Sequence, residues 1–148
     1  HSCKDLPNVN EMTWYAANDP CWDDFELWTT MGHLYKGGMW LKKKAYISGF
    51  NINSAPVNGD WRTSNRNGNW SVPYTLPPIS DASKYFFLPT SGYYLQGVLN
   101  IGGNGYYWSS SASLGYGDRA YVLTLTSGRI YVDWNDGRVK GYRVQKFE

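Results

Sequence analysis

The cluster best suited to chemistry lies near the C-terminus, where Asp133, Asn135 and Asp136 fall close together. Carboxylate and amide oxygens are the ligands that calcium prefers in proteins. Residues 133–137 begin like an EF-hand calcium loop, but the oxygen spacing differs by one position and no glutamate closes the loop. The sequence therefore predicts no cofactor, with Asn135 and Asp136 retained as weak candidate calcium ligands.

No other pattern predicts catalysis. The two histidines are His1, at the chain end, and His33, which has no second ligand at a metal-binding interval. The run Ser109–Ser111 lacks the strand-turn-helix context of an activated nucleophile. Residues 102–105 are glycine-rich, but no Lys-Ser or Lys-Thr pair follows them. We therefore expect no enzyme. A hydrolase in which Asp118 and Asp136 converge is the remaining catalytic alternative.

Composition indicates one β-rich domain. A chain of 148 residues is long enough for one core and too short for two comfortable ones, so we expect a single domain over residues 1–148. Aromatic residues make up 18% of the chain and glycine is abundant, a balance that favours short strands joined by turns.

The charges are segregated along the chain. Residues 1–35 carry one lysine and six acids, whereas residues 36–148 carry thirteen bases and six acids, for a net charge of +2. The basic run Lys42–Lys44 is too short to indicate nucleic-acid binding. No apolar run has the length of a membrane span, and no signal peptide begins at His1. We expect neither a nucleic-acid partner nor membrane insertion.

The two cysteines leave two interpretations open. A disulfide between Cys3 and Cys21 would tie the chain end to the first loop. Two buried free thiols are the ordinary alternative in a reducing compartment.

Helix signals are confined to the first quarter of the chain. Asn8 or Asn10 can cap a short helix that ends before Pro20. A second helix is expected to begin at Asp23 or Asp24, because apolar residues then recur at intervals of three and four as far as Leu34. This pattern predicts two N-terminal helices.

Strand signals dominate the remainder. Alternation and turn residues predict strands over 39–47, 85–88, 105–111, 121–126, 129–133 and 142–147. Residues 48–77 show little periodicity, and we expect a long excursion held in place by Trp61 and Trp70. The expected fold class is α+β, with short antiparallel strands and long loops after the helices.

The strand motifs resemble those of a known family. They comprise Gly105-Tyr-Tyr-Trp-Ser-Ser-Ser111, the alternating segment Ala120–Val132, and Arg138-x-x-Gly141-x-x-Val144. Together with Leu6–Tyr15 and Leu34–Trp40, they resemble bacterial and phage C-type-lectin-like domains. Such domains occur in fimbria-associated surface proteins and in the variable proteins of diversity-generating retroelements. The resemblance implies a C-type-lectin-like fold and a secreted, cell-surface or virion location.

The resemblance also implies which residues contact a ligand. Its members display changeable residues on their last strands and loops, at positions that alternate with apolar ones. The corresponding ligand-binding candidates here are Tyr116, Asp118, Arg119, Thr124, Thr126, Arg129, Tyr131, Asp133, Trp134, Asn135, Asp136, Lys140 and Tyr142. Trp108, in contrast, is expected to belong to the scaffold.

The expected function is a noncatalytic recognition or adhesion module for a protein or glycan on a cell surface. One alternative is an assembly module of a fimbria or phage fibre. Another is a calcium-dependent sugar-binding lectin, because Trp134-Asn135-Asp136 matches the calcium-ligand triplet of animal lectins in residue type.

Overall fold

Antiparallel strands are the main secondary structure, with 43% of residues in strands and 15% in helices. The computed structural model describes residues 5–95, 98–101, 103–115, 119–137, 142–145 and 147–148; the side chains of 93–95, 99–100 and 135–137 lie outside this description. The elements are α1 (Val9–Ala17), β1 (Cys21–Thr30), β2 (His33–Lys42), η2 (Lys44–Tyr46), β3 (Gly68–Ser71), η3 (Ile79–Lys84), β4 (Tyr85–Pro89), β5 (Tyr93–Leu95), β6 (Val98–Asn100), β7 (Gly105–Ala112), β8 (Arg119–Thr126) and β9 (Arg129–Gly137).

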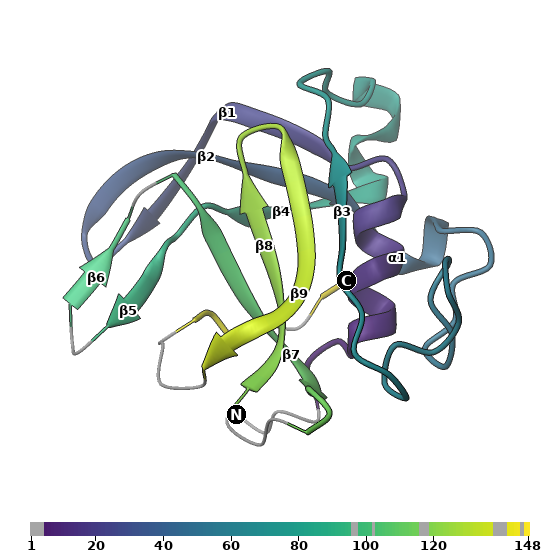
Figure 1. The fold of residues 1–148 in the computed structure, drawn as a ribbon. Helices are drawn as coiled ribbons and strands as arrows, with labels where there is room; N and C mark the ends of the chain where they lie inside the picture. Colours follow the sequence, from purple (N-terminus) through teal and green to yellow (C-terminus); the bar gives the residue numbers. More distant parts are fainter. Residues whose placement is uncertain (1–4, 96–97, 102, 116–118, 138–141, 146) are drawn as a thin grey trace.

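The strands form two antiparallel sheets and a small ribbon (Figure 1). One sheet has the order β1-β2-β4 and the other the order β3-β9-β8-β7, while β5 pairs with β6. The distal parts of β1 and β2 and the β5–β6 ribbon lie at the end of the molecule opposite α1 (Figure 1).

The first helix follows the sequence prediction. The Asn8 side chain accepts a hydrogen bond from the Glu11 amide at 2.9 Å, and the Asn8 amide donates to the Glu11 carboxylate at 3.3 Å. This capping box satisfies two amides that a helix N-terminus leaves without partners. Val9, Met12 and Tyr15 are spaced three apart and are completely buried.

The predicted second helix is wrong: its residues form the β1–β2 hairpin. Asp23 does accept amide hydrogen bonds, from Phe25 and Glu26, but it does so within a bulge of β1. Met31 and Gly32 both have positive φ, 51° and 78°, which suits a two-residue hairpin turn. The expected α+β class, a C-type-lectin-like fold with two N-terminal helices, is therefore wrong: the described residues form a mostly β structure with two antiparallel sheets.

The apolar residues at intervals of three and four gave the wrong prediction because they do not form a buried face. Phe25, Leu27, Met31 and Leu34 are all exposed, at 60% or more of their surface. Helical periodicity predicts a helix only where one face packs against a core. Here the β-branched and aromatic residues of the segment favour strands instead.

Two strand predictions also need correction. The stretch 39–47 ends its strand at Lys42 and then forms the short helix η2. Residues 142–145 form no strand, only a parallel bridge between Arg143 and Tyr107. The excursion over 48–77 is held as expected, since Trp61 is 1% exposed and Trp70 packs against the core.

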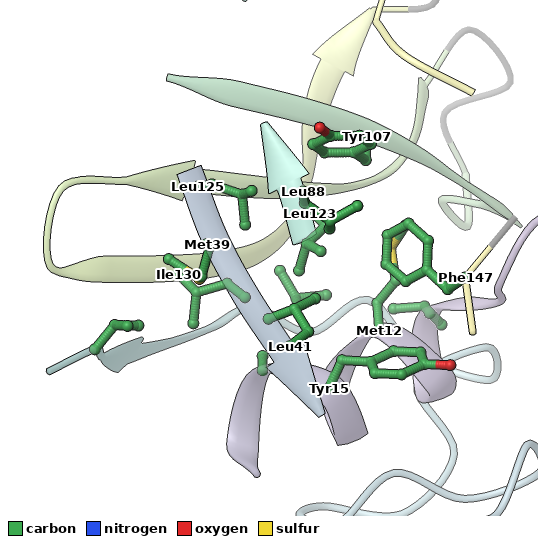
Figure 2. Close-up of a cluster of buried hydrophobic side chains, with 14 of the residues drawn as sticks. Met12, Tyr15, Met39, Leu41, Leu88, Tyr107, Leu123, Leu125, Ile130 and Phe147 are labelled. Carbon is green, nitrogen blue, oxygen red and sulfur yellow. The ribbon is translucent and has the colours of Figure 1, made fainter. Parts of the chain in front are cut away.

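The core lies between the two sheets and α1 (Figure 2). Met12 and Tyr15 of α1 meet Leu41 of β2 and the C-terminal Phe147 there. Tyr15 makes edge contacts with Phe50, Phe86 and Phe147, with ring centroids 5.3–5.7 Å apart. Burial raises the pKa of Tyr15, so the phenol stays neutral inside this cluster.

Candidate ligand-binding face

The sheet β3-β9-β8-β7 has one face on the core and a second face directed outward. Tyr106 pairs across the strands with Thr124, Thr124 with Tyr131, and Tyr131 with Asn69. Residues directly opposite each other share a face, so these four side chains form one row. The next row faces the core and contains the fully buried Tyr107, Leu123 and Val132. We call the opposite side the outer face.

An arginine spans one end of the outer face. Thr126 pairs with Arg129, and Arg129 with Ser71, in the last row before the β8–β9 turn. The Arg129 guanidinium donates to Asn69 Oδ1 and to Ser71 Oγ, the latter at 3.4 Å. Two hydrogen bonds to β3 therefore hold the guanidinium over this strand.

Three aromatic rings lie together at the other side of the face. The ring of Tyr142 stacks on Tyr106, with centroids 4.8 Å apart and planes 13° apart, and lies 4.7 Å from Trp108. The backbone holds this contact, because Trp108 N donates to Arg143 O and Arg143 N donates to Tyr106 O, each at 3.0 Å. Val122, paired with Trp108 on the same face, is completely buried.

The structure brings five of the candidates together. Thr124, Thr126, Arg129, Tyr131 and Asp133 lie on the outer face and are all half-buried. Tyr142 joins them at the β7 edge but is only 7% exposed, while Arg119 is half-buried at the start of β8.

Trp134 lies elsewhere. The β8–β9 register shifts between Ala120 and Val122, so that β9 carries one extra residue opposite Tyr121. Trp134, at this bulge, packs against the core cluster and is half-buried. Tyr116, Asp118 and Lys140, and the side chains of Asn135 and Asp136, lie outside the described residues.

Sequence reasoning missed part of the face. Trp108 was expected in the scaffold, yet Tyr107 takes the core position and Trp108 lies beside Tyr106 on the outer face. The alternation in β7 could have revealed this, had its phase been set from Tyr107. Asn69 and Ser71 join only through the pairing of β3 with β9, about 60 residues away, which no local pattern signals.

The serine run Ser109–Ser111 makes hydrogen bonds that connect β7 to the N-terminal segment. Ser111 Oγ accepts from Val9 N at 3.1 Å, and Ser110 N donates to Pro7 O at 2.9 Å. These contacts join the β7 bulge to the start of α1. Burial raises the pKa of the neighbouring Tyr107 to about 12, and its hydroxyl donates to Pro89 O at 2.6 Å.

Metal and redox groups are sparse in the described part of the chain. Across those residues, no three of the His, Cys, Asp and Glu side chains gather into a metal-binding group. Cys21 is a buried free thiol, and burial raises its pKa; Cys3 lies outside the described residues.

In the described segments, no helix has both the length and the apolar character needed to span a membrane. No protein-family model matches this chain, and neither a curated protein nor a solved structure with significant similarity was found.

Proposed function

We propose that this protein is a noncatalytic recognition module that binds a protein or glycan on its outer face. One observation carries the proposal: Tyr106, Thr124, Tyr131 and Asn69 form a continuous row of aromatic and polar side chains across four strands. The buried core row lies on the opposite side of the sheet, and in this row Asn69 is exposed while Tyr106, Thr124 and Tyr131 are half-buried, so part of each side chain faces solvent.

The residue types of the outer face support recognition. Tyrosine and tryptophan provide large contact area at low entropic cost, and Thr, Asn, Arg and Asp adapt hydrogen bonds to a ligand. Tyrosine, tryptophan and arginine contribute most of the binding free energy at many protein interfaces.

The face is also preorganised. The Tyr106–Tyr142–Trp108 cluster and the Arg129 bonds to β3 hold side chains in place before a ligand arrives. Fewer rotamers are then lost on binding, which lowers the entropic cost of association. The motif resemblance to C-type-lectin-like surface proteins supports a ligand site on these same strands. It also supports a secreted, cell-surface or virion location.

The test is a binding screen with matched tyrosine variants. The domain is screened against glycan and surface-protein arrays, with and without calcium, and hits are measured by calorimetry. Tyr131→Ala should weaken binding by about tenfold or more, as expected for an interface anchor. Tyr46→Ala, which removes a half-exposed tyrosine near η2, should leave affinity unchanged. Equal affinities for both variants, or no ligand under either condition, would refute the proposal.

A second candidate, an assembly module, rests on the β1–β2 hairpin. Phe25, Leu27, Met31 and Leu34 expose 78, 60, 66 and 64% of their surfaces there. Exposed apolar groups of this kind mark interaction sites. If a second copy packs on the hairpin, sedimentation velocity should show concentration-dependent dimers that the Leu27→Lys, Leu34→Lys variant abolishes. A monomer at all concentrations would rule out self-assembly through this hairpin.

A further inference from the structure

A small cavity lies on the side of the β1-β2-β4 sheet that faces away from the core. Trp40 and Tyr85 alternate along their strands with the buried Leu41 and Phe86, so they point to this opposite side. The cavity measures about 190 Å³, enough for one long side chain and less than the usual small-molecule site. Its lining includes Asp23, Glu26, Trp40, Leu76, Ile79 and Tyr85.

One wall carries a buried carboxylate. Asp23 is 6% exposed, and its oxygens accept bonds from Phe25 N at 2.8 Å, Glu26 N at 3.0 Å and Trp40 Nε1 at 3.0 Å. These three donors fix the orientation of the carboxylate in the wall. The second carboxylate, Glu26, is exposed at the rim. The cavity therefore has a negative side held in place by the β1 bulge.

Ion pairing decides whether these two carboxylates can accept a cation from a ligand. Within the described residues, neither Asp23 nor Glu26 forms an ion pair. Three lysines of the neighbouring elements have other partners: Lys36 of β2 lies over the Phe25 ring at 5.9 Å, Lys42 of β2 bonds Asp19 at 2.8 Å, and Lys84 of η3 bonds Asp81 at 3.1 Å. The negative charge thus remains available to a ligand.

The other walls suit an aliphatic stem and a cation. Trp40 and Tyr85 contribute aromatic rings, and cations bind favourably over such rings. Leu76 and Ile79 at the cavity are 50% and 95% exposed, so a ligand would cover apolar surface that is now in water. A methylene chain ending in a positive charge matches this combination.

The adjoining strand indicates a polypeptide as the source of that group. β1 is an outer strand of its sheet, and from Leu27 to Thr30 its backbone bonds only β2 in the described part of the chain. An outer strand of this kind can pair with an extended peptide. An extended partner here would pass the cavity that Glu26 lines.

We propose that the cavity is a socket for a lysine or arginine side chain of an extended polypeptide partner. The ammonium or guanidinium group lies between Asp23 and Glu26, its stem crosses Trp40, and the partner backbone lies along β1. This site is separate from the outer face.

The test uses the whole chain and a defined probe. The probe peptide is acetyl-Val-Thr-Lys-Thr-Val-amide, and its binding is followed through the Trp40 indole N–H resonance in ¹⁵N NMR. Replacing the peptide's lysine by norleucine keeps the stem and removes the charge. We expect the norleucine peptide to bind about tenfold or more weakly.

Matched variants locate the effect. Glu26→Gln should weaken the lysine peptide severalfold and reduce its salt dependence, whereas Glu148→Gln, an exposed glutamate paired with Lys43, should change neither. Ile79→Ser should weaken both peptides, with little risk to folding because Ile79 is exposed. Equal binding of both peptides, or an unaffected Glu26→Gln variant, would overturn the proposal. Butylammonium that binds as tightly as the peptide would overturn its polypeptide part.

Discussion

The Tyr142 ring lies nearly parallel to that of Tyr106, with centroids 4.8 Å apart, and thereby fastens residues 142–145 to the edge of β7. Tyr142 is buried although it follows the last strand. Removing its ring should leave a void beside Tyr106 and Trp108. Tyr142→Ala should therefore lower the unfolding free energy by about 3 kcal/mol in urea titration.

The control keeps the ring. Tyr142→Phe retains the stacking surface and should lose about 1 kcal/mol or less. A Phe variant as unstable as the Ala variant would show that ring packing is not what Tyr142 contributes.

Asn8 joins the helix start to the long excursion. Its Oδ1 caps the Glu11 amide, and its Nδ2 donates to Ile52 O at 2.8 Å. Asn8→Ala should lower the unfolding free energy by about 1–2 kcal/mol, measured by urea unfolding. Asn8→Ser keeps a capping acceptor and loses only the bond to Ile52, so it should cost less than Asn8→Ala; the reverse order would contradict the capping role.

Asp60 should make stability depend on acid pH. Hydrogen bonds from Arg62 and Asn10 hold the pKa of Asp60 well below its usual range. A depressed folded pKa stabilises the fold above the unfolded pKa of about 3.9, and this contribution is lost as pH falls below that value. The unfolding free energy of wild type should thus drop more steeply between about pH 5 and pH 2 than that of Asp60→Asn.

An exposed aspartate provides the comparison. Asp81 pairs with Lys84 of η3 at 3.1 Å, in a pair whose side chains are 41% and 44% exposed. The Asp81→Asn variant should follow the wild-type pH profile. Parallel profiles for wild type and Asp60→Asn would contradict the assignment to Asp60.

Gly38 lies where β2 approaches β4 most closely. A β-carbon at this position would collide with Leu88 O and the Phe87 ring. Gly38→Ala should shift the strands apart and lower the melting temperature by several degrees, equivalent to about 2 kcal/mol or more. Gly59→Ala meets no atom within 4 Å and should cost only the strain of its positive φ, about 1 kcal/mol. A smaller loss at Gly38 than at Gly59 would be inconsistent with this packing.

Local chemistry in the sequence determined α1 and the alternating strands. Asn8 and Glu11, three apart before apolar residues, form the capping box that starts α1. The alternation of β8 and β9 places Thr124 and Tyr131 on one face. These signals act over a few residues, so they are readable without a fold.

Only the tertiary structure decided the rest. Residues 23–34 carry helix-like spacing, but the apolar side chains that give this spacing are exposed, and residues 23–30 pair with residues 33–38 as a hairpin. The outer face needed β3 beside β9 and Tyr142 on Tyr106. Such contacts depend on how distant segments share buried area, which is a property of the whole chain and not of any local pattern.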